Sequence, residues 1–323
     1  MQAMKTLLAS LLAVSSVASA AVGAPEGDAA SIAVVEPTAH VPPVPLLWRV
    51  SDGDNALYLL GSFHLLKDGD YPLSADIDRA FAAAEKVVFE IPPAALRDPT
   101  TGQRFLDAAA YDDGQTLSDV LSPRMREKLH RLMARQGGTI AQVEGYEPWF
   151  VNLSLLMGLS QSLGFSAEQG LDRHLMARAE AVGKATAGLE TFDDQLRALD
   201  STPMDEQVVG LQDFIDRPRE MPGVLADLHQ AWREGDVERL DRLTRTEMLE
   251  ETPETYRIVN VERNEAWLPK LQAMLDDNAG DDIMVVVGAL HLLGGDGVVA
   301  MLRDRGYVVE RVCSVCGVAV DSD

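Results

Sequence analysis

Two histidines stand at matching places near opposite ends of this 323-residue chain. Residues 57–66 read LYLLGSFHLL and residues 284–293 read MVVVGALHLL, so His64 and His291 each follow a glycine by three positions. A continuous apolar run predicts a buried parallel strand, and the glycine allows the backbone to turn at its end. Because α/β proteins bind ligands beyond the carboxyl ends of their strands, the two imidazoles indicate one site for metal binding or proton transfer.

A carboxylate occupies a similar strand-end position at Glu90. It follows the apolar residues 87–89, where a buried carboxylate is costly unless it is paired or binds a metal ion. If this strand lies beside the one that ends at Gly61, Glu90 and His64 share one edge of the sheet. The alternative interpretation is that Glu90 is the first solvated residue after the strand, ahead of two prolines.

Three further polar residues fit the same site. Glu190 follows the short predicted strand 184–189, and Gln195 comes one helical turn later. Thr191 can cap the helix that follows, which gives this segment a purely structural alternative. Arg263 lies in a charged helix, where it is either a surface residue or a clamp for a carboxylate or an oxyanion.

Hydrophobic patterns place an α/β segment at each end of the chain and a mostly helical segment between them, from about residue 105 to residue 275. The fold class is therefore predicted to be α/β, with a mixed central sheet from two related terminal α/β halves and a large helical insert. Predicted strands cover 46–50, 56–60, 86–91, 184–189, 282–287 and 307–312, the first two joined as a hairpin. Predicted helices cover 75–85 with Ser74 as N-cap, 117–135, 149–163, 171–182, 223–234, 237–250, 252–276 and 297–304.

Composition indicates a globular protein with a strongly acidic surface. Hydrophobic residues make up 46% of the chain and charged residues 24%, which is too apolar for a disordered chain. The 28 basic and 51 acidic residues give a net charge of −23. Such a field repels a phosphate backbone or an anionic lipid surface, so the composition argues against nucleic acid as a partner.

The first residues, 1–24, have the pattern of a secretory signal peptide. A short basic region and an apolar stretch precede small residues that suit cleavage. Residues 25–45 then read as a linker rich in Pro and Ala, residues 46–316 as the folded domain and residues 317–323 as a tail. Because no later stretch approaches the roughly 20 apolar residues that span a membrane, the mature chain is predicted to be exported without a membrane span, either periplasmic or secreted.

The two cysteines, Cys313 and Cys316, form a CxxC sequence near the C-terminus. This spacing is compatible with a redox pair, half of a zinc site or a local disulfide. A redox CxxC usually opens a helix near the start of a fold, and a zinc site needs further soft ligands nearby. For an exported chain, the local disulfide is the favoured interpretation.

Taken together, these motifs resemble the TraB/GumN family. The resemblance rests on the two GxxH sequences, Glu90 after its apolar strand, Gly188-Leu189-Glu190-Thr191 with Gln195, and Glu262-Arg263-Asn264 with Trp267. The family looks like part of a wider clan that includes Tiki metal-dependent proteases, erythromycin esterases and ChaN-like haem-binding proteins. The resemblance implies an α/β core of two related halves. It also implies a site centred on His64, Glu90 and His291 and supported by Arg263 and Glu190.

Three hypotheses on function follow. The leading one is a metal-dependent hydrolase, a peptidase acting on a peptide or a small ester or amide, with zinc, manganese or cobalt bound by His64, His291 and Glu90. Glu90 would alternatively activate the water as a base, with Arg263 and Glu190 completing the catalytic set. The second hypothesis is a metal-free, esterase-like hydrolase in which His64 is the general base. The third is a non-catalytic protein that binds a peptide or haem.

Overall fold

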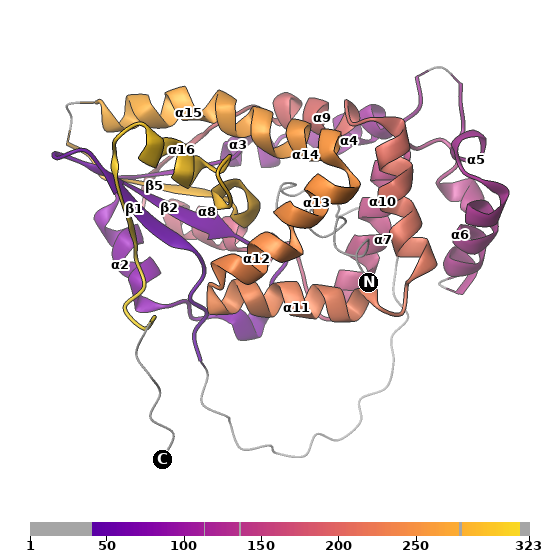
Figure 1. Cartoon of the computed structure of the whole chain (residues 1–323), viewed down its shortest axis with the longest axis horizontal. Coiled ribbons are helices and arrows are strands. Elements are labelled where there is room, and N and C mark those ends of the chain that lie inside the picture. The colour runs from indigo at the N-terminus through magenta and orange to yellow at the C-terminus, as the bar shows by residue number, and fades with distance from the viewer. Residues whose placement is uncertain (1–40, 113, 136, 278–279, 317–323) are drawn as a thin grey trace, which may run out of the picture.

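A mixed six-stranded sheet organises the computed structural model, which describes residues 41–112, 114–135, 137–277 and 280–316 (Figure 1). The strand order is β4-β3-β5-β2-β1-β6. Neighbours from β4 to β2 pair in parallel, and β1 pairs antiparallel with both β2 and β6. The strands are β1 (Leu47–Ser51), β2 (Ala56–Ser62), β3 (Lys86–Phe89), β4 (Ala185–Gly188), β5 (Ile283–Gly288) and β6 (Val308–Arg311). The predicted α/β fold with a mixed sheet and an initial hairpin is therefore confirmed.

The two strands that precede the histidines are direct neighbours in the sheet. β2 and β5 pair in parallel, with Leu57 opposite Ile283 and Ser62 opposite Gly288. Every residue of β5 is buried, as is every residue of β2 except Tyr58. Strands covered on both faces must be apolar along their whole length, which explains the two unbroken hydrophobic runs. The matching end segments are thus adjacent strands that end at one edge of the sheet.

Gly61 is required where these strands leave the sheet. A Cβ atom at this position would lie 3.1 Å from the Cβ atom of Leu46 and 3.2 Å from that of Ala289. The Gly61 N–H also donates to the Leu46 carbonyl at 2.8 Å. The backbone of the first GxxH segment therefore packs directly against the start of the second, and a larger side chain would separate them.

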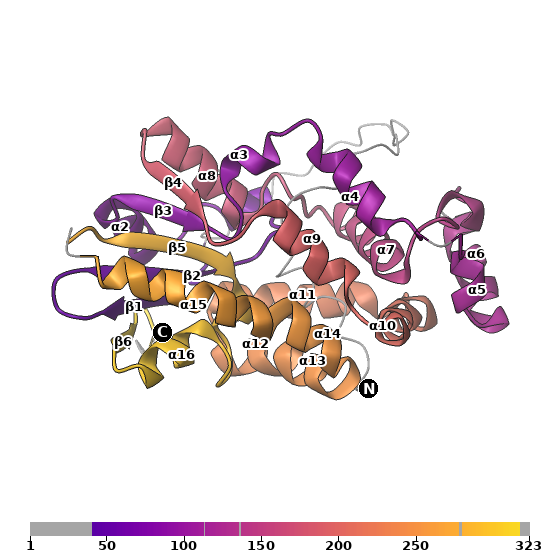
Figure 2. The same cartoon turned by 90° about the horizontal axis from the view of Figure 1, so that it is seen from above.

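Helices cover the sheet and extend away from the carboxyl ends of its parallel strands. Figure 1 shows α15 above the sheet and α2 below it, and Figure 2 shows the strands side by side with α5 and α6 at the far end of the molecule. The α-helices are α2 (Ala75–Ala83), α3 (Pro93–Leu96), α4 (Thr101–Ala109), α5 (Leu117–Val120), α6 (Pro123–Arg135), α7 (Pro148–Ser162), α8 (Leu171–Ala181), α9 (Phe192–Asp200), α10 (Met204–Asp216), α11 (Met221–Glu234), α12 (Val237–Leu243), α13 (Arg245–Glu251), α14 (Pro253–Tyr256), α15 (Glu262–Leu275) and α16 (Val298–Asp304). Shorter turns are η2 (Asp68–Asp70), η3 (Ile140–Gln142), the π-helical η4 (Arg257–Val261) and η5 (Ala289–Leu292).

Three of the long helices predicted from periodicity are interrupted. The first is divided between α5 and α6, because Pro123 disfavours a helical conformation in the residue before it. The second is divided at Thr244, whose φ and ψ of −128° and −82° lie outside the helical region. The third contains the π-helical turn η4. Helices α4 and α10 were absent from the predicted elements.

Two predicted helix starts have different outcomes. Thr191 caps α9, since its side chain accepts a hydrogen bond from the Asp194 N–H. Ser74 precedes α2 at the N-cap position, but its side chain makes no capping hydrogen bond. Both predicted N-cap positions are confirmed, and the capping hydrogen bond from the side chain is present at Thr191 alone of the two.

The predicted local disulfide is present between Cys313 and Cys316. The predicted signal peptide, most of the linker and the tail at 317–323 lie outside the described residues. Within the described part of the chain, no helix is both long and apolar enough to cross a membrane.

Candidate functional site

Four neighbouring parallel strands each deliver one polar side chain to the same edge of the sheet. His64 follows β2, Glu90 follows β3, Glu190 follows β4 and His291 follows β5. All four are buried, and His291 has no exposed surface. Arg263 reaches the same place from α15 and is also buried. The structure therefore brings together the five residues that the sequence nominated.

Glu90 is held by donors from three different elements. Its Oε1 accepts from the Gly288 N–H at 2.6 Å, and its Oε2 accepts from Arg263 Nη2 at 2.7 Å and from Gln195 Nε2 at 3.2 Å. Burial raises the pKa of the Glu90 carboxyl, and the nearby positive charge of Arg263 opposes that rise. The alternative interpretation of Glu90 as a solvated residue after the strand is therefore wrong.

Arg263 uses all of its donor groups on protein acceptors. Nε bonds to Glu190 at 3.2 Å, and Nη2 bonds to Glu190 at 2.6 Å as well as to Glu90. Nη1 donates to the Val259 carbonyl at 3.1 Å and lies 3.2 Å from His291 Nε2. A guanidinium has five N–H groups, so these contacts account for each of them. The predicted role as an oxyanion clamp would require one of these bonds to be given up.

The elements around Arg263 explain its fixed position. Val259 lies in the π-helical turn η4, and π-helical turns of this kind often occur at functional sites. Trp267, one turn further along α15, lies 4.8 Å below the guanidinium and donates its Nε1–H to Glu190 at 3.0 Å. Cation–π contact and a shared carboxylate therefore restrain the arginine from its own helix.

His291 is a neutral imidazole with a fixed tautomer. Asn264 Nδ2 donates to the Asp296 carbonyl at 2.9 Å, which turns its Oδ1 toward His291 Nδ1 at 2.8 Å. Nδ1 therefore carries the proton, and Nε2 accepts from Arg263. Burial lowers the pKa of His291 well below its ordinary value, and the positive charge of Arg263 lowers it further. His291 is suited to accept a hydrogen bond rather than to hold an additional proton.

His64 has the opposite electrostatic environment. Its Nδ1 lies 2.5 Å from Oδ2 of Asp172, a buried residue in the first turn of α8. The Ser62 hydroxyl donates to the same oxygen, also at 2.5 Å. Burial alone would raise the pKa of Asp172, but the charge and hydrogen bond of His64, together with Ser62, hold it below its usual range. The resulting carboxylate places the proton on His64 Nδ1 and stabilises the imidazolium form.

Sequence reasoning missed Asp172 and Ser62. Asp172 lies among charged residues at the start of a helix, a pattern typical of a solvated surface. In the structure, a Cβ atom at Gly170 would lie 2.2 Å from the His64 carbonyl oxygen. This contact brings the start of α8 against the histidine loop, and the Leu171 N–H donates to the Phe63 carbonyl at 3.1 Å.

A second buried carboxylate fixes the far end of the His64 loop. Asp70 accepts from the Lys67 N–H at 2.9 Å, lies 2.9 Å from His229 Nε2 and pairs with Arg233. His229 and Arg233 both belong to α11, whose Trp232 donates to the Gly61 carbonyl at 3.0 Å. The loop that carries His64 is thus bound to the helical region on both sides.

The predicted metal ligands do not form a metal site in this arrangement. Among the described residues, no group of three or more His, Cys, Asp or Glu side chains could hold a metal ion. His291 Nε2 lies 3.9 Å from Glu90 Oε1, and the guanidinium of Arg263 contacts both residues. Arg263 therefore places a positive charge between the two residues, and it engages the Nε2 lone pair through which His291 would bind a metal ion.

Comparison with known proteins agrees with the geometry of the site. A model of the TraB/PrgY/gumN family matches residues 46–311. The chain belongs to the TraB/PrgY/gumN family. The family resemblance found in the GxxH sequences is thereby confirmed. The match covers all six strands of the sheet, from β1 to β6.

Two curated proteins show the range of the similarity. The uncharacterized protein YbaP of Escherichia coli strain K12 is 24% identical over 251 residues, which cover 78% of this chain and 89% of YbaP. The metalloprotease TIKI2 of Danio rerio is 22% identical over 303 residues, which cover 79% of this chain and 58% of TIKI2. This chain thus matches little more than half of TIKI2. No solved structure matches the chain.

The neutral state of His291 predicts a pH-dependent stability. In the unfolded chain His291 binds a proton below about pH 6.5, whereas the folded pKa is much lower, so falling pH favours unfolding. As pH falls, the wild-type chain should lose free energy of unfolding. His291→Gln should reduce this loss by up to about 1.4 kcal/mol for each pH unit below 6.5. Urea unfolding at about pH 7 and about pH 5.5 measures the difference, with exposed His130→Gln as the control. Equal pH slopes in wild type and His291→Gln would contradict a buried neutral imidazole.

Proposed function

We propose that this chain is a hydrolase that uses His64 as a general base to cleave a peptide, amide or ester bond. The observation that carries the proposal is the difference between the two GxxH histidines. His64 faces the Asp172 carboxylate, whereas His291 faces the neutral Asn264 amide and the Arg263 cation. Two titratable groups held in opposite environments are typical of a site that moves protons.

In this proposal, the Nε2 lone pair of His64 removes a proton from water as the water attacks the substrate carbonyl carbon. Asp172 stabilises the imidazolium that results and keeps the ring oriented. The same Nε2–H then protonates the leaving nitrogen or oxygen as its bond to carbon breaks. His64 returns to its neutral form, so that water has been added across the bond and no other reactant is needed.

Glu90, Glu190, Arg263 and His291 would form the rigid wall of this site. Their mutual hydrogen bonds fix a guanidinium and two carboxylates in a buried region, where charges act more strongly than in water. The charge of His64 acts on both Glu90 and His291, which is consistent with close approach. The network would therefore respond electrostatically when His64 gains a proton.

A metal-dependent hydrolase is the second candidate, because the similar protein TIKI2 is named a metalloprotease. This candidate assigns His64, His291 and Glu90 as ligands, and both imidazoles do have the Nδ1 partners that commonly orient metal-binding histidines. It requires Arg263 to leave His291, because Nη1 engages the Nε2 lone pair that a metal ion would use. Metal content and metal dependence therefore separate the two candidates.

The test is a screen of the purified chain against fluorogenic peptides, amides and esters, with and without a chelator, beside elemental analysis. We expect hydrolysis that survives the chelator and falls by about 10³-fold or more in His64→Gln. His130→Gln, an exposed histidine on α6, should retain full activity. Stoichiometric metal that disappears in His64→Gln, together with chelator-sensitive activity, would select the metal-dependent candidate. A wild-type chain that cleaves none of the substrates would contradict both.

A further inference from the structure

A basic stripe runs along α6, at the end of the molecule farthest from the sheet (Figure 2). The stripe consists of Arg124, Lys128, Arg131 and Arg135. At 3.6 residues per turn, these four positions fall within an arc of about 60° on the helix surface. The apolar residues of α6 face another direction, and Met125 and Leu129 are buried. The helix therefore presents four of its five Lys and Arg side chains on one side, in a chain whose net charge is −23.

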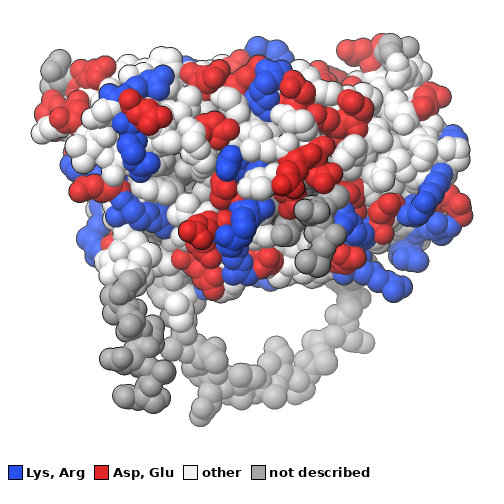
Figure 3. Space-filling view, viewed as in Figure 1, with Lys and Arg blue, Asp and Glu red and all other residues white. Residues whose placement is uncertain are grey.

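The stripe forms one wall of a pocket. The loop between α10 and α11 brings Arg217 and Arg219 to the opposite wall, facing Lys128, Arg131 and Arg135. The cavity has a volume of about 330 Å³, which lies at the lower end of the range for small-molecule sites. Five cationic and two acidic side chains line it. Figure 3 shows blue side chains gathered at the end of the molecule that α6 occupies.

Two of these cations have no counter-ion within the described part of the chain. Arg135 and Arg219 are exposed and make no hydrogen bond or ion pair through their side chains to another described residue. Lys128 bonds to Asp216 at 2.7 Å, and Arg217 bonds to Asp213 at 3.1 Å, so each of these is partly neutralised. Like charges held together in this way repel one another, and an anion between them would relieve that repulsion.

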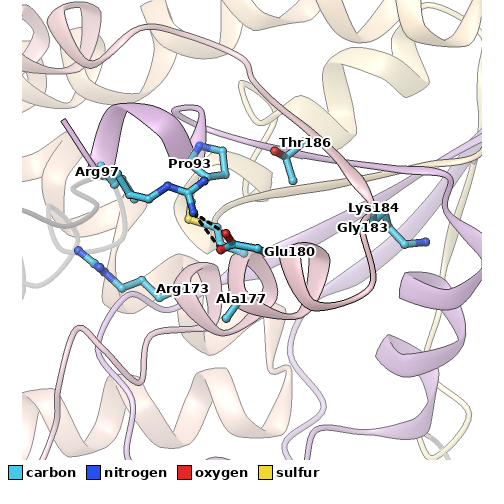
Figure 4. Close-up of a pocket in the computed structure, with 10 residues that line it drawn as sticks. Pro93, Arg97, Arg173, Ala177, Glu180, Gly183, Lys184 and Thr186 are labelled. Atoms are coloured by element: carbon cyan, nitrogen blue, oxygen red, sulfur yellow. Dashed lines mark hydrogen bonds and ion pairs between the residues drawn. The ribbon is translucent and has the colours of Figure 1, made fainter.

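A second pocket lies beside the edge strand β4 and is also lined by basic residues (Figure 4). Its volume is about 490 Å³. Arg97 makes two bonds to Glu180, at 2.9 and 3.0 Å, across the pocket. The Lys184 ammonium donates to the carbonyls of Phe81 and Ala84. Arg97 and Lys184 are thus already paired with protein groups, which distinguishes them from Arg135 and Arg219 in the pocket on α6.

We propose that the α6 pocket binds a phosphate-bearing anion. Guanidinium groups bind phosphate through paired N–H donors, and Arg135 and Arg219 offer such groups from opposite walls of one cavity. The strongly acidic chain repels anions over most of its surface, so the attraction must be local to the pocket. The phosphate is supplied either by a free anion or by the headgroup of an anionic lipid. This site is separate from the proposed hydrolase site.

Two probes test the proposal and identify the source of the phosphate. Calorimetric titration with pyrophosphate at low ionic strength tests a free anion, and co-sedimentation with phosphatidylglycerol vesicles, against phosphatidylcholine vesicles, tests a lipid headgroup. We expect Arg135→Glu with Arg219→Glu to weaken binding by about tenfold or more. The control is Arg126→Glu with Arg303→Glu, which changes the net charge equally but lies on the opposite side of α6 and on α16.

Each binding result either supports or overturns the phosphate site in the α6 pocket. Binding of either probe that is lost in the pocket variant and kept within about twofold in the control supports the site, and the probe that binds names the source. Equal weakening in both variants would show that net charge alone is responsible, and the proposal would fail. Absence of binding by wild type to both probes would also overturn it.

Discussion

Arg263→Met is expected to destabilise the fold by about 3–5 kcal/mol. The guanidinium lies between the buried carboxylates of Glu90 and Glu190 and contacts both. Methionine keeps much of the side-chain volume but leaves two buried acids without a cation, and uncompensated buried charges are among the most costly changes in a protein core. Because burial already raises the pKa of Glu90, loss of the cation should raise it further.

The sign of the pH dependence distinguishes this effect from lost packing. A folded pKa raised above the unfolded value of Glu90 makes the folded state bind more protons, so the variant should lose stability as pH rises through the folded pKa. Urea unfolding over a pH series measures the free energy of unfolding of Arg263→Met at each pH. Adding Glu190→Gln should recover part of the loss, since one of the two charges is removed. Arg97→Met, which breaks an exposed pair with Glu180, should cost less than about 1 kcal/mol. Equal losses in Arg263→Met and Arg97→Met would refute the buried network.

Much of the site could be predicted from the sequence because its residues follow buried parallel strands. The runs that became β2 and β5 are apolar along their whole length, a pattern that few other elements produce. Parallel strands end at one edge of a sheet, so the residues directly after them are brought together by topology. His64, Glu90, Glu190 and His291 were found by this reasoning.

The remaining features depend on contacts between segments far apart in the chain. Asp172 and His64 are separated by 108 positions. The sequence of α8 around Asp172 has no hydrophobic pattern that predicts burial of this carboxylate. The interruption of the helix before Arg263 by a π-helical turn also escaped prediction, because a single inserted residue changes the hydrophobic period very little. The sequence also predicted a clamp for a carboxylate or an oxyanion at Arg263. In the structure its donors hold the carboxylates of Glu90 and Glu190.

Asp172→Asn is expected to reduce hydrolysis by about 10³- to 10⁴-fold while leaving the chain folded. The substitution preserves size but removes the charge that stabilises the His64 imidazolium. An asparagine amide can also donate to Nδ1, which would place the imidazole proton on Nε2 and abolish the base. This prediction rests on the proposed role of His64 and concerns Asp172 as a positioning residue.

The pH profile separates this role from a merely structural one. Without the carboxylate, the imidazolium is less stable, so the acid limb of the pH–rate profile should move to lower pH by about one unit or more. Ser62→Ala removes the second bond to the same Asp172 oxygen but keeps the charge, so it should leave the acid limb in place and cost less than about tenfold. Nitrogen chemical shifts of labelled histidine report the His64 tautomer in each variant, whether or not a substrate is known. If Asp172→Asn keeps the wild-type tautomer and the wild-type acid limb, the carboxylate does not control His64, and the base must be sought elsewhere among the strand-end residues.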